Sequence, residues 1–365
     1  MAGYTDEIDE LEKEVAKTKY NKRTQKHIGL VKAKIAMLKD KERARSSGGK
    51  KGKGYSVRKA GDASVIMIGF PSSGKSTLLN IMTGADSPVG AYEFTTLDVI
   101  PGMLNHRHAQ IQVLDVPGIV HGAAMGRGRG KEVLAVIQSA DMVVFLVDVF
   151  RPQALKVLER EVYDAHIRVN HQKPDVKITK QSKGGVRIGK TLRCSDLTNE
   201  TIEAMMRQMR LNNVDVVIRS KINADQLIDV IEGNKKYVPG IIVLNKIDAV
   251  SPEELAEVKK EVKPDICISA KNGVGIDPLK DIIFDKLNLM RIYCKEVSKK
   301  ADMEVPLIIK KSSTLHDMCE KLHKDFVKKF TFAKVWGSSV KHSGQKVMKL
   351  THVLKDNDVV EIHLK

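Results

Sequence analysis

The sequence predicts an α/β protein built on a doubly wound sheet, with an α+β subdomain inserted into it, a helical hairpin before it and a small domain after it. Three observations predict this architecture. Apolar, strand-sized runs alternate with helical patterns over residues 61–289, polar or glycine-rich signatures follow where these runs end, and residues 171–237 exceed what the sheet needs.

Length and charge limit the classes of protein. The 365 residues suffice for two or three domains. The net charge of +17 lies mainly at the ends, because residues 1–60 hold 17 Lys/Arg against 8 Asp/Glu and residues 296–365 hold 14 against 9. Basic ends favour contact with RNA phosphates, although lysine-rich helices are also often solvated faces. No apolar run approaches a membrane span and the N-terminus is unlike a signal peptide, so we expect a cytoplasmic protein without membrane contact.

The first segment, residues 1–54, is expected to be a basic helical region with a linker. Between Thr5 and Arg45, apolar residues recur at three- and four-residue steps, which is typical of a helical hairpin with one apolar stripe. The turn-forming and basic stretch SSGGKKGKG, residues 46–54, predicts a flexible linker.

An apolar strand from Ala63 to Phe70 runs directly into Gly69-x4-Gly74-Lys75-Ser76 and a helix. This strand–loop–helix context is the one that a phosphate-binding P-loop requires. Glycines let successive N–H groups point at a phosphate, Lys75 would neutralise the β- and γ-phosphates, and Ser76 would bind Mg²⁺. The expected nucleotide contacts here are Gly69, Phe70, Pro71, Ser72, Ser73, Gly74, Lys75, Ser76 and Thr77.

Two further strand ends indicate which base is bound. GIIVLNKID ends in Asn245-Lys246-x-Asp248, and ICISAKNGVG supplies Ser269-Ala270-Lys271. An aspartate can accept two hydrogen bonds from the N1–H and the N2 amino group of guanine, whereas adenine has no matching pair of donors. In this order the motifs favour GTP and leave little room for an ATPase or a kinase. We expect base contacts from Asn245, Lys246, Asp248, Ser269, Ala270 and Lys271.

Two loops carry candidate sensors of the γ-phosphate. QIQVLDVPG places Asp115 at a strand end, where it would hold Mg²⁺ through water, and Gly118, whose N–H would meet the γ-phosphate. YEFTTLDVIPG offers Thr95 and Thr96, of which Thr96 is the expected Mg²⁺ ligand. Catalysis would rest on Lys75, Thr96 and Gly118, and the metal ligands would be Ser76, Thr96 and Asp115. Loops that order around GTP and relax after hydrolysis make a switch.

The insertion follows from spacing. Asp148 and Asn245 end successive strands but lie 97 positions apart, where one helix and one strand need about thirty. A helix is expected from Pro152 to about Asn170. The surplus of residues 171–237 predicts a β-hairpin (VKIT, Gly184-Gly185, VRIG), a helix from Asn199 to Leu211, a strand from Val214 to Ile218 and a helix from Asn223. The sheet domain would therefore comprise residues 61–170 and 238–289.

The C-terminal segment, residues 290–365, predicts a β-grasp domain. Two strands, RIYCKEV and PLIIKK, precede a helix from Thr314 to Leu322 and short strands near Phe332–Val335, Val347–Leu350 and Val359–Leu364. The stretch KLHKDFVKKFTFAKVWG mixes basic and aromatic residues, which could stack on RNA bases or fill a small core. The core is the expected place for at least two of the aromatic residues.

The motifs GFPSSGKST, YEFTTL, DVPGIVHGAAMGRGRG, NKID and SAK together resemble the Obg-related GTPases, and among them the developmentally regulated GTP-binding (DRG) proteins. The resemblance spans the chain. It implies a P-loop GTPase G domain, an insert similar to domain 2 of ribosomal protein S5 and a C-terminal TGS domain. It also implies a cytoplasmic protein linked to ribosomes and translation, with a possible protein partner at the TGS region.

One position departs from Ras-like enzymes. Where a glutamine orients the attacking water, this chain has Ile119, which cannot hydrogen-bond water. Three alternatives remain open: a partner supplies the missing group, a monovalent cation such as K⁺ acts as the electrophile, or GTP is bound without meaningful turnover. Related GTPases that use K⁺ often carry asparagine at the P-loop position that is Ser72 here. Arg127 and Arg129 are candidate arginine fingers, although a Gly-Arg loop serves equally well as a mobile contact surface.

The expected function is that of a GTP-binding protein that hydrolyses GTP to GDP and phosphate with Mg²⁺, slowly on its own, as a ribosome-associated molecular switch. The alternative is an RNA- or ribosome-binding module whose conformation is set by GTP, with hydrolysis incidental. RNA affinity that depends on salt and ignores the nucleotide would favour the alternative.

Overall fold

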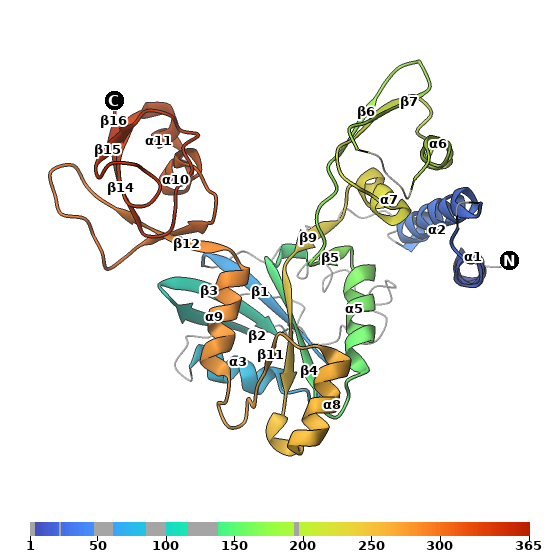
Figure 1. The fold of residues 1–365 in the computed structure, drawn as a ribbon, viewed down its shortest axis with the longest axis horizontal. Coiled ribbons are helices and arrows are strands. Elements are labelled where there is room, and N and C mark those ends of the chain that lie inside the picture. The colour runs from blue at the N-terminus through green and yellow to red at the C-terminus, as the bar shows by residue number, and fades with distance from the viewer. Residues whose placement is uncertain (1–3, 22, 47–60, 85–99, 116–137, 193–196) are drawn as a thin grey trace. The chain divides into compact units, whose positions relative to one another are not determined.

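The computed structural model describes residues 4–21, 23–46, 61–84, 100–115, 138–192 and 197–365. The predicted threonine loop around Thr95 and Thr96, and the segment holding Gly118, Ile119, Arg127 and Arg129, lie outside these residues. The chain forms two compact units, which we describe one at a time. Of the described residues, one unit holds the N-terminal helices and His166–Tyr237, and the other holds those that remain (Figure 1).

The second unit is organised around a six-stranded sheet with the order β11-β10-β4-β1-β3-β2. All neighbours are parallel except β2, which runs antiparallel to β3. The order reverses at β1, and ligands in such sheets bind at the carboxyl ends of strands beside this point. The strands are β1 (Ala63–Ile68), β2 (Ile100–His106), β3 (Ala109–Asp115), β4 (Met142–Asp148), β10 (Gly240–Asn245) and β11 (Ile266–Cys267).

Both faces of this sheet are buried, as continuous apolar strands require. Every residue of β1 is buried, and Val65 and Met67 belong to a core cluster with Leu78 of α3 and Leu279 of α9. The helices that alternate with these strands are α3 (Lys75–Thr83), α5 (Ala154–Asp164), α8 (Pro252–Val262) and α9 (Ile276–Lys286), and a 3₁₀ turn spans Ile247–Ala249. The predicted doubly wound sheet is confirmed.

The N-terminal hairpin is confirmed as α1 (Tyr4–Lys17) and α2 (Gln25–Ser46), and α2 packs on two helices of the insert, α6 (Asn199–Gln208) and α7 (Ala224–Glu232). The crossing of α2 and α6 is close at Gly29, where a Cβ atom would lie only 3.1 Å from Thr201 Cγ2 and 3.2 Å from Met205 Sδ. Lys32 also pairs with Asp225 at 2.7 Å. The hairpin and the insert therefore share one core.

The predicted β-hairpin of the insert is wrong in its pairing. The strands β6 (Val176–Lys180) and β7 (Val186–Lys190) are present, but β8 (Val214–Ile218) lies between them in the order β6-β8-β7. β8 is antiparallel to β6 and parallel to β7. The reason is burial, because Val214, Val216 and Ile218 are the most buried residues of this sheet and belong at its centre.

The predicted helix from Pro152 to Asn170 is too long. α5 ends at Asp164, and positive φ angles at His166 (66°) and Asn170 (56°) bracket a short strand, β5 (Ile167–Val169). This strand pairs with β9 (Lys236–Val238), so the chain entering the insert meets the chain leaving it. The sequence pattern of β5 is too short to be told from a helix end.

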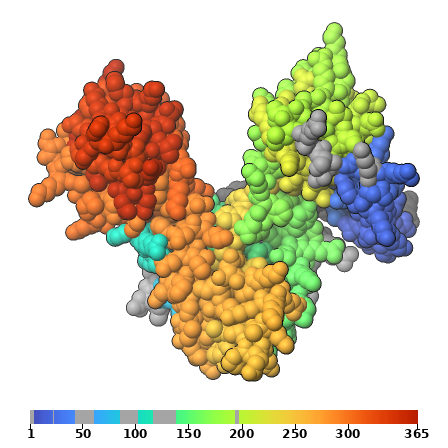
Figure 2. All heavy atoms as spheres, viewed as in Figure 1, coloured from blue at the N-terminus to red at the C-terminus, as the bar shows by residue number. Residues whose placement is uncertain are grey.

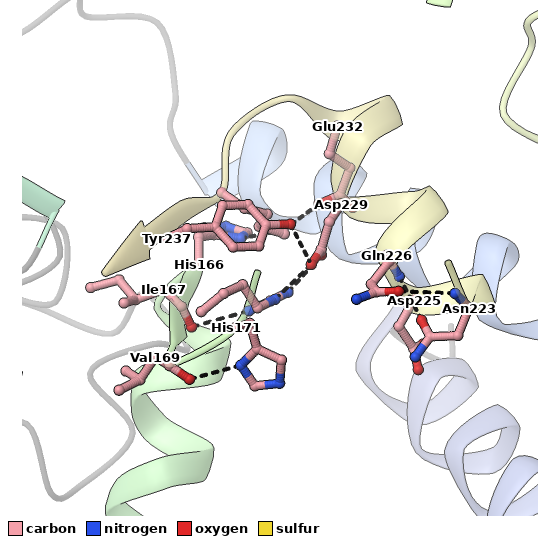
Figure 3. Close-up of polar contacts among 12 residues, drawn as sticks. His166, Ile167, Val169, His171, Asn223, Asp225, Gln226, Asp229, Glu232 and Tyr237 are labelled. Carbon is pink, nitrogen blue, oxygen red and sulfur yellow. Dashed lines mark hydrogen bonds and ion pairs between the residues drawn. The ribbon is translucent and has the colours of Figure 1, made fainter. Parts of the chain in front are cut away.

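A buried polar network stabilises this junction (Figure 3). Both Arg168 and Asp229 are about 5% exposed, and the guanidinium donates two hydrogen bonds, each 2.7 Å long, to the carboxylate. The hydroxyl of Tyr237 lies 3.5 Å from the same carboxylate, and burial and the charge of Asp229 raise the pKa of Tyr237 to about 12. Nearby, Lys235 pairs with Glu232 and His166.

The C-terminal domain is a five-stranded sheet with the order β13-β12-β16-β14-β15. Its core includes Ile292, Met318 and Val335, while Phe332 and Trp336 contact lysines. The parallel pair β12–β16 beside antiparallel pairs agrees with the predicted β-grasp topology. The elements are β12 (Leu289–Cys294), β13 (Leu307–Lys310), α10 (Leu315–Leu322), α11 (Lys324–Lys329), β14 (Phe330–Trp336), β15 (Gln345–Val347) and β16 (Asp358–Leu364). None of the helices that the structure describes is long and apolar enough to cross a membrane.

Candidate nucleotide-binding site

The loop between β1 and α3 is the predicted phosphate-binding loop. It turns through left-handed conformations at Ser72 (φ 64°) and Gly74 (φ 94°), and α3 begins at Lys75. A Cβ atom at Gly69 would lie 2.6 Å from the Leu146 carbonyl oxygen, and one at Gly74 would lie 2.4 Å from Asn245 Nδ2. Both glycines are therefore required by close approaches, and the start of α3 presents free N–H groups to an anion.

Lys75 lies folded over the loop. Its ammonium donates hydrogen bonds to the carbonyl oxygens of Gly69 (3.0 Å) and Phe70 (3.2 Å). Burial lowers the pKa of Lys75, and the nearby carboxylate of Asp115 opposes that shift. Neutral carbonyls are weaker acceptors than phosphate oxygens, so the ammonium is placed where a phosphate would bind it more strongly.

Asp115 at the end of β3 and Ser76 in the first turn of α3 meet beside this loop. The Ser76 hydroxyl donates a 3.1 Å hydrogen bond to Asp115 Oδ2. The other oxygen, Oδ1, is buried and has no hydrogen-bond partner among the described residues. The Ser76 hydroxyl and the Asp115 carboxylate, whose Oδ1 is buried without a partner among the described residues, fit Mg²⁺. This ion prefers oxygen ligands and retains several waters.

Asn245 connects the phosphate loop to the predicted base-binding loop. It is 1% exposed at the end of β10. Its Nδ2 donates to the Ser73 carbonyl oxygen at 2.9 Å, and its Oδ1 accepts from the Ala270 N–H at 3.0 Å. Both ends of the amide are thus used, and the two loops are fixed relative to each other through one side chain.

The surroundings of Asp248 keep its carboxyl group ionised. The Ser269 hydroxyl donates a 2.5 Å hydrogen bond to Asp248 Oδ1, and this bond lowers the pKa of the exposed Asp248 carboxyl. Ser269 Oγ also accepts from the Asn272 N–H at 3.2 Å, which secures the loop. Lys271 is exposed, and its charge also favours the ionised form of Asp248. The carboxylate therefore stays ionised and able to accept hydrogen bonds.

Sequence reasoning missed Asp148. Its Oδ2 lies 2.6 Å from the ammonium of Lys246, and its Oδ1 accepts from the Phe150 N–H at 3.0 Å. No local sequence signal indicates this pair, because it depends on strand register, in which Asp148 ends β4 directly opposite Asn245 of β10. Phe70, Ser73, Asp148 and Lys246 contribute to the lining of a cavity of about 200 Å³ beside the phosphate loop.

The structure thus brings together most of the predicted site residues that it describes. Gly69 to Ser76, Asp115, Asn245, Asp248, Ser269 and Ala270 lie at neighbouring strand ends of one sheet. Pro71, Ser72 and Thr77 are exposed in the same segment. Thr95, Thr96 and Gly118 lie outside the described residues and stay predictions.

This fold and this site define a P-loop GTP-binding protein. Residues 64–180 match the family described as "50S ribosome-binding GTPase", residues 183–289 match the "C-terminal region of MMR_HSR1 domain", and residues 290–364 match the TGS domain. Developmentally-regulated GTP-binding protein 1 of Xenopus laevis is 43% identical over 366 residues, covering 99% of both chains. An uncharacterized GTP-binding protein of Methanocaldococcus jannaschii is 47% identical over 369 residues, covering 100% of this chain and 94% of that protein.

The chain belongs to the developmentally regulated GTP-binding protein family. Among solved structures, the YchF GTPase of Schizosaccharomyces pombe is similar over 84% of this chain and 99% of that chain, with 12% identity and a TM-score of 0.48. Era of Aquifex aeolicus is similar over 62% of this chain and 57% of that chain, with 21% identity and a TM-score of 0.32.

Proposed function

We propose that this protein hydrolyses GTP to GDP and phosphate with Mg²⁺ and acts as a cytoplasmic, ribosome-associated switch. The observation that carries the proposal is the side chain of Asn245. It holds the Ser73 carbonyl with one end and the Ala270 N–H with the other. A phosphate cradle and a base-recognition loop joined in this way form a single site for a nucleotide.

Guanine selection rests on Asp248. Its carboxylate is ionised and anchored by Ser269, and an ionised carboxylate can accept hydrogen bonds from N1–H and the N2 amino group of guanine. The Ala270 N–H is committed to Asn245, so it shapes the loop rather than presenting a free donor. Adenine offers this carboxylate no matching pair of donors, so ATP would bind more weakly than GTP.

The phosphate end rests on Lys75, Ser76 and Asp115. Lys75 neutralises charge on the β- and γ-phosphates, and the N-terminus of α3 adds backbone donors. Ser76 and Asp115 would hold Mg²⁺, which supplies further neutralisation of the phosphate charge. Catalysis of this kind consists of positioning and charge stabilisation and needs no covalent intermediate.

The water-positioning group is supplied from outside the position that follows Gly118. Ile119 replaces the glutamine of Ras-like enzymes, so we propose slow intrinsic hydrolysis that K⁺ or a partner accelerates. The ribosome is the proposed partner, and the match to a family described as "50S ribosome-binding GTPase" supports it. The net charge of +17 also favours an RNA-rich partner.

The test is steady-state phosphate release from GTP in K⁺ and in Na⁺ at equal ionic strength, with and without ribosomes. Lys75→Ala is the inactive control. Stimulation by K⁺ assigns the electrophilic role to the cation, and stimulation by ribosomes assigns it to a group supplied in trans. GTP binding without hydrolysis under all four conditions would contradict the proposed hydrolysis and favour a ribosome-binding module in which GTP sets conformation.

A further inference from the structure

The insert presents one open sheet face. Its helices α6 and α7 cover the face that carries Val176, Ile178, Val186 and Ile188. The opposite face carries the alternate residues of the three strands. In register, one row across this face is Lys177–Val217–Gly189 and the next is Thr179–Asp215–Arg187. We call this set the outer face of the insert.

The outer face and its adjoining loop are strongly basic. Residues 171–191 contain six Lys/Arg and one Asp. Lys177 and Arg187 are exposed on the face, Lys180 and Lys183 are exposed at the tip, and none of the four has an ion-pair partner among the described residues. The carboxylate on this face, Asp215, accepts a 2.6 Å hydrogen bond from Gln181. A positive field of this kind complements a polyanion.

Gly189 is a second, independent observation. It lies inside β7, where glycine weakens a strand, and neither its backbone angle nor its packing requires glycine. A Cβ atom there would meet nothing within 4 Å. By contrast, Gly184 and Gly185 at the tip have positive φ angles of 113° and 72°. A glycine that this chain does not need is typical of a place where another backbone approaches closely.

The chemistry of the face selects the kind of ligand. The strands β6, β7 and β8 contain no aromatic residue, so they offer no platform for stacking bases. Each cation faces a small residue at the other edge of its row, because Gly189 is in the row of Lys177 and Thr179 is in the row of Arg187. Such a surface suits the sugar–phosphate backbone of an RNA duplex, which proteins recognise by shape and charge.

We infer that the outer face of the insert docks double-helical RNA through its backbone, with Lys177 and Arg187 on phosphates, Lys180 and Lys183 at the tip, and Gly189 clearing the approach. Figure 2 shows the yellow-green tip of this segment projecting beyond the helices of its own unit. The inference rests on the proposed ribosome association and names the surface that would make that contact.

The first test uses a mixed-sequence RNA duplex of about 20 base pairs as the probe. Lys177→Glu/Arg187→Glu is compared with Lys259→Glu/Lys260→Glu, which reverses two exposed lysines on α8 and matches the charge change. We expect the first variant to bind roughly tenfold or more weakly and to lower the slope of log K against log salt by about 2, because two phosphate contacts are lost. Equal losses in both variants would overturn the proposal.

The second test asks whether RNA binding depends on close approach at Gly189 and not on charge alone. Gly189→Val adds a side chain with higher strand propensity into open space, so the unfolding temperature should stay the same or rise. We expect the same variant to bind the RNA duplex at least about fivefold more weakly, because the branched side chain blocks the close approach. Unchanged RNA affinity in Gly189→Val would overturn the docking geometry.

GTP hydrolysis of the wild type and of both variants is measured in parallel. Intact hydrolysis with lost RNA binding supports the inference and leaves the proposed GTPase untouched. A wild-type protein that binds the RNA duplex but does not hydrolyse GTP would contradict the proposed function and not this surface. Ribosome binding that is lost in Lys177→Glu/Arg187→Glu, while the RNA duplex binds neither protein, would assign the face to an acidic protein and overturn the RNA assignment.

Discussion

Asn245 Nδ2 donates a 2.9 Å hydrogen bond to the Ser73 carbonyl oxygen, across 172 positions of sequence. The other end of the same amide accepts from the Ala270 N–H at 3.0 Å. Because Asn245 is 1% exposed, water cannot replace either bond. This side chain therefore sets the spacing between the loop that would hold phosphates and the loop that would hold the base.

Asn245→Asp tests this connection. The carboxylate retains an acceptor for the Ala270 N–H but loses the donor to Ser73 and places a buried charge against a carbonyl oxygen. We expect GTP affinity to fall roughly tenfold or more, since a buried acceptor is left unpaired. Asn272→Asp is the control, because Asn272 is exposed and its backbone N–H makes the loop contact. Equal affinities of the two variants, measured by calorimetry, would refute the bridging role.

Asp248→Asn tests base selection. The amide offers a donor where the carboxylate accepts, so it clashes with the donors of guanine and suits the additional carbonyl oxygen of xanthine. We expect GTP affinity to drop about a hundredfold and affinity for xanthosine triphosphate to rise. Competition against a fluorescent guanine nucleotide measures both. A variant that keeps its preference for GTP would mean that Asp248 does not contact the base.

Lys75 is expected to make nucleotide affinity depend on pH. Burial lowers the pKa of Lys75 in the free protein, and phosphate charge would raise it in the complex. Binding then takes up protons above the free-protein pKa, so GTP affinity should be greatest below that pKa and fall as pH rises through it. Lys75→Arg keeps its charge and should show a flatter profile. Ionisation of guanine affects both proteins equally, so parallel profiles would contradict the role of Lys75.

The Arg168–Asp229 pair is expected to stabilise the insert junction. Asp229→Ala removes both hydrogen bonds that the buried Arg168 guanidinium donates to the carboxylate, and we expect this to cost about 3–5 kcal/mol of unfolding free energy. Asp225→Ala, on the same helix, removes a partly exposed pair with Lys32 and should cost about 1 kcal/mol or less. Denaturant unfolding followed by circular dichroism compares them. Similar losses of unfolding free energy in the two variants would show that the buried pair stabilises the protein no more than the exposed pair does.

Local signals made the nucleotide site predictable from sequence. The P-loop, NKID and SAK are short segments that directly follow apolar strands, and parallel strands bring their carboxyl ends to one edge. The side-chain contacts between distant segments were not predictable in the same way. Nothing local indicates that Asn245 bonds to Ser73, or that Asp148 holds Lys246, because both contacts depend on the order of strands in the sheet.

The errors lie where pairing is non-local. VKIT and VRIG flank a glycine turn, which is the usual sign of a hairpin, yet β8 lies between them because its inward residues are the most buried of this sheet. The three residues of β5 follow α5 too closely for periodicity to separate them, and the buried Arg168 finds its partner 61 positions away.

The most direct test of the nucleotide site is calorimetric titration of the wild-type protein with GTP and with ATP, each with and without Mg²⁺. We expect GTP to bind at one site, Mg²⁺ to strengthen GTP binding through Ser76 and Asp115, and ATP to bind about a hundredfold more weakly or not at all. Equal affinities for ATP and GTP, or GTP binding that ignores Mg²⁺, would contradict the assignment of Asp248 or of Asp115, respectively.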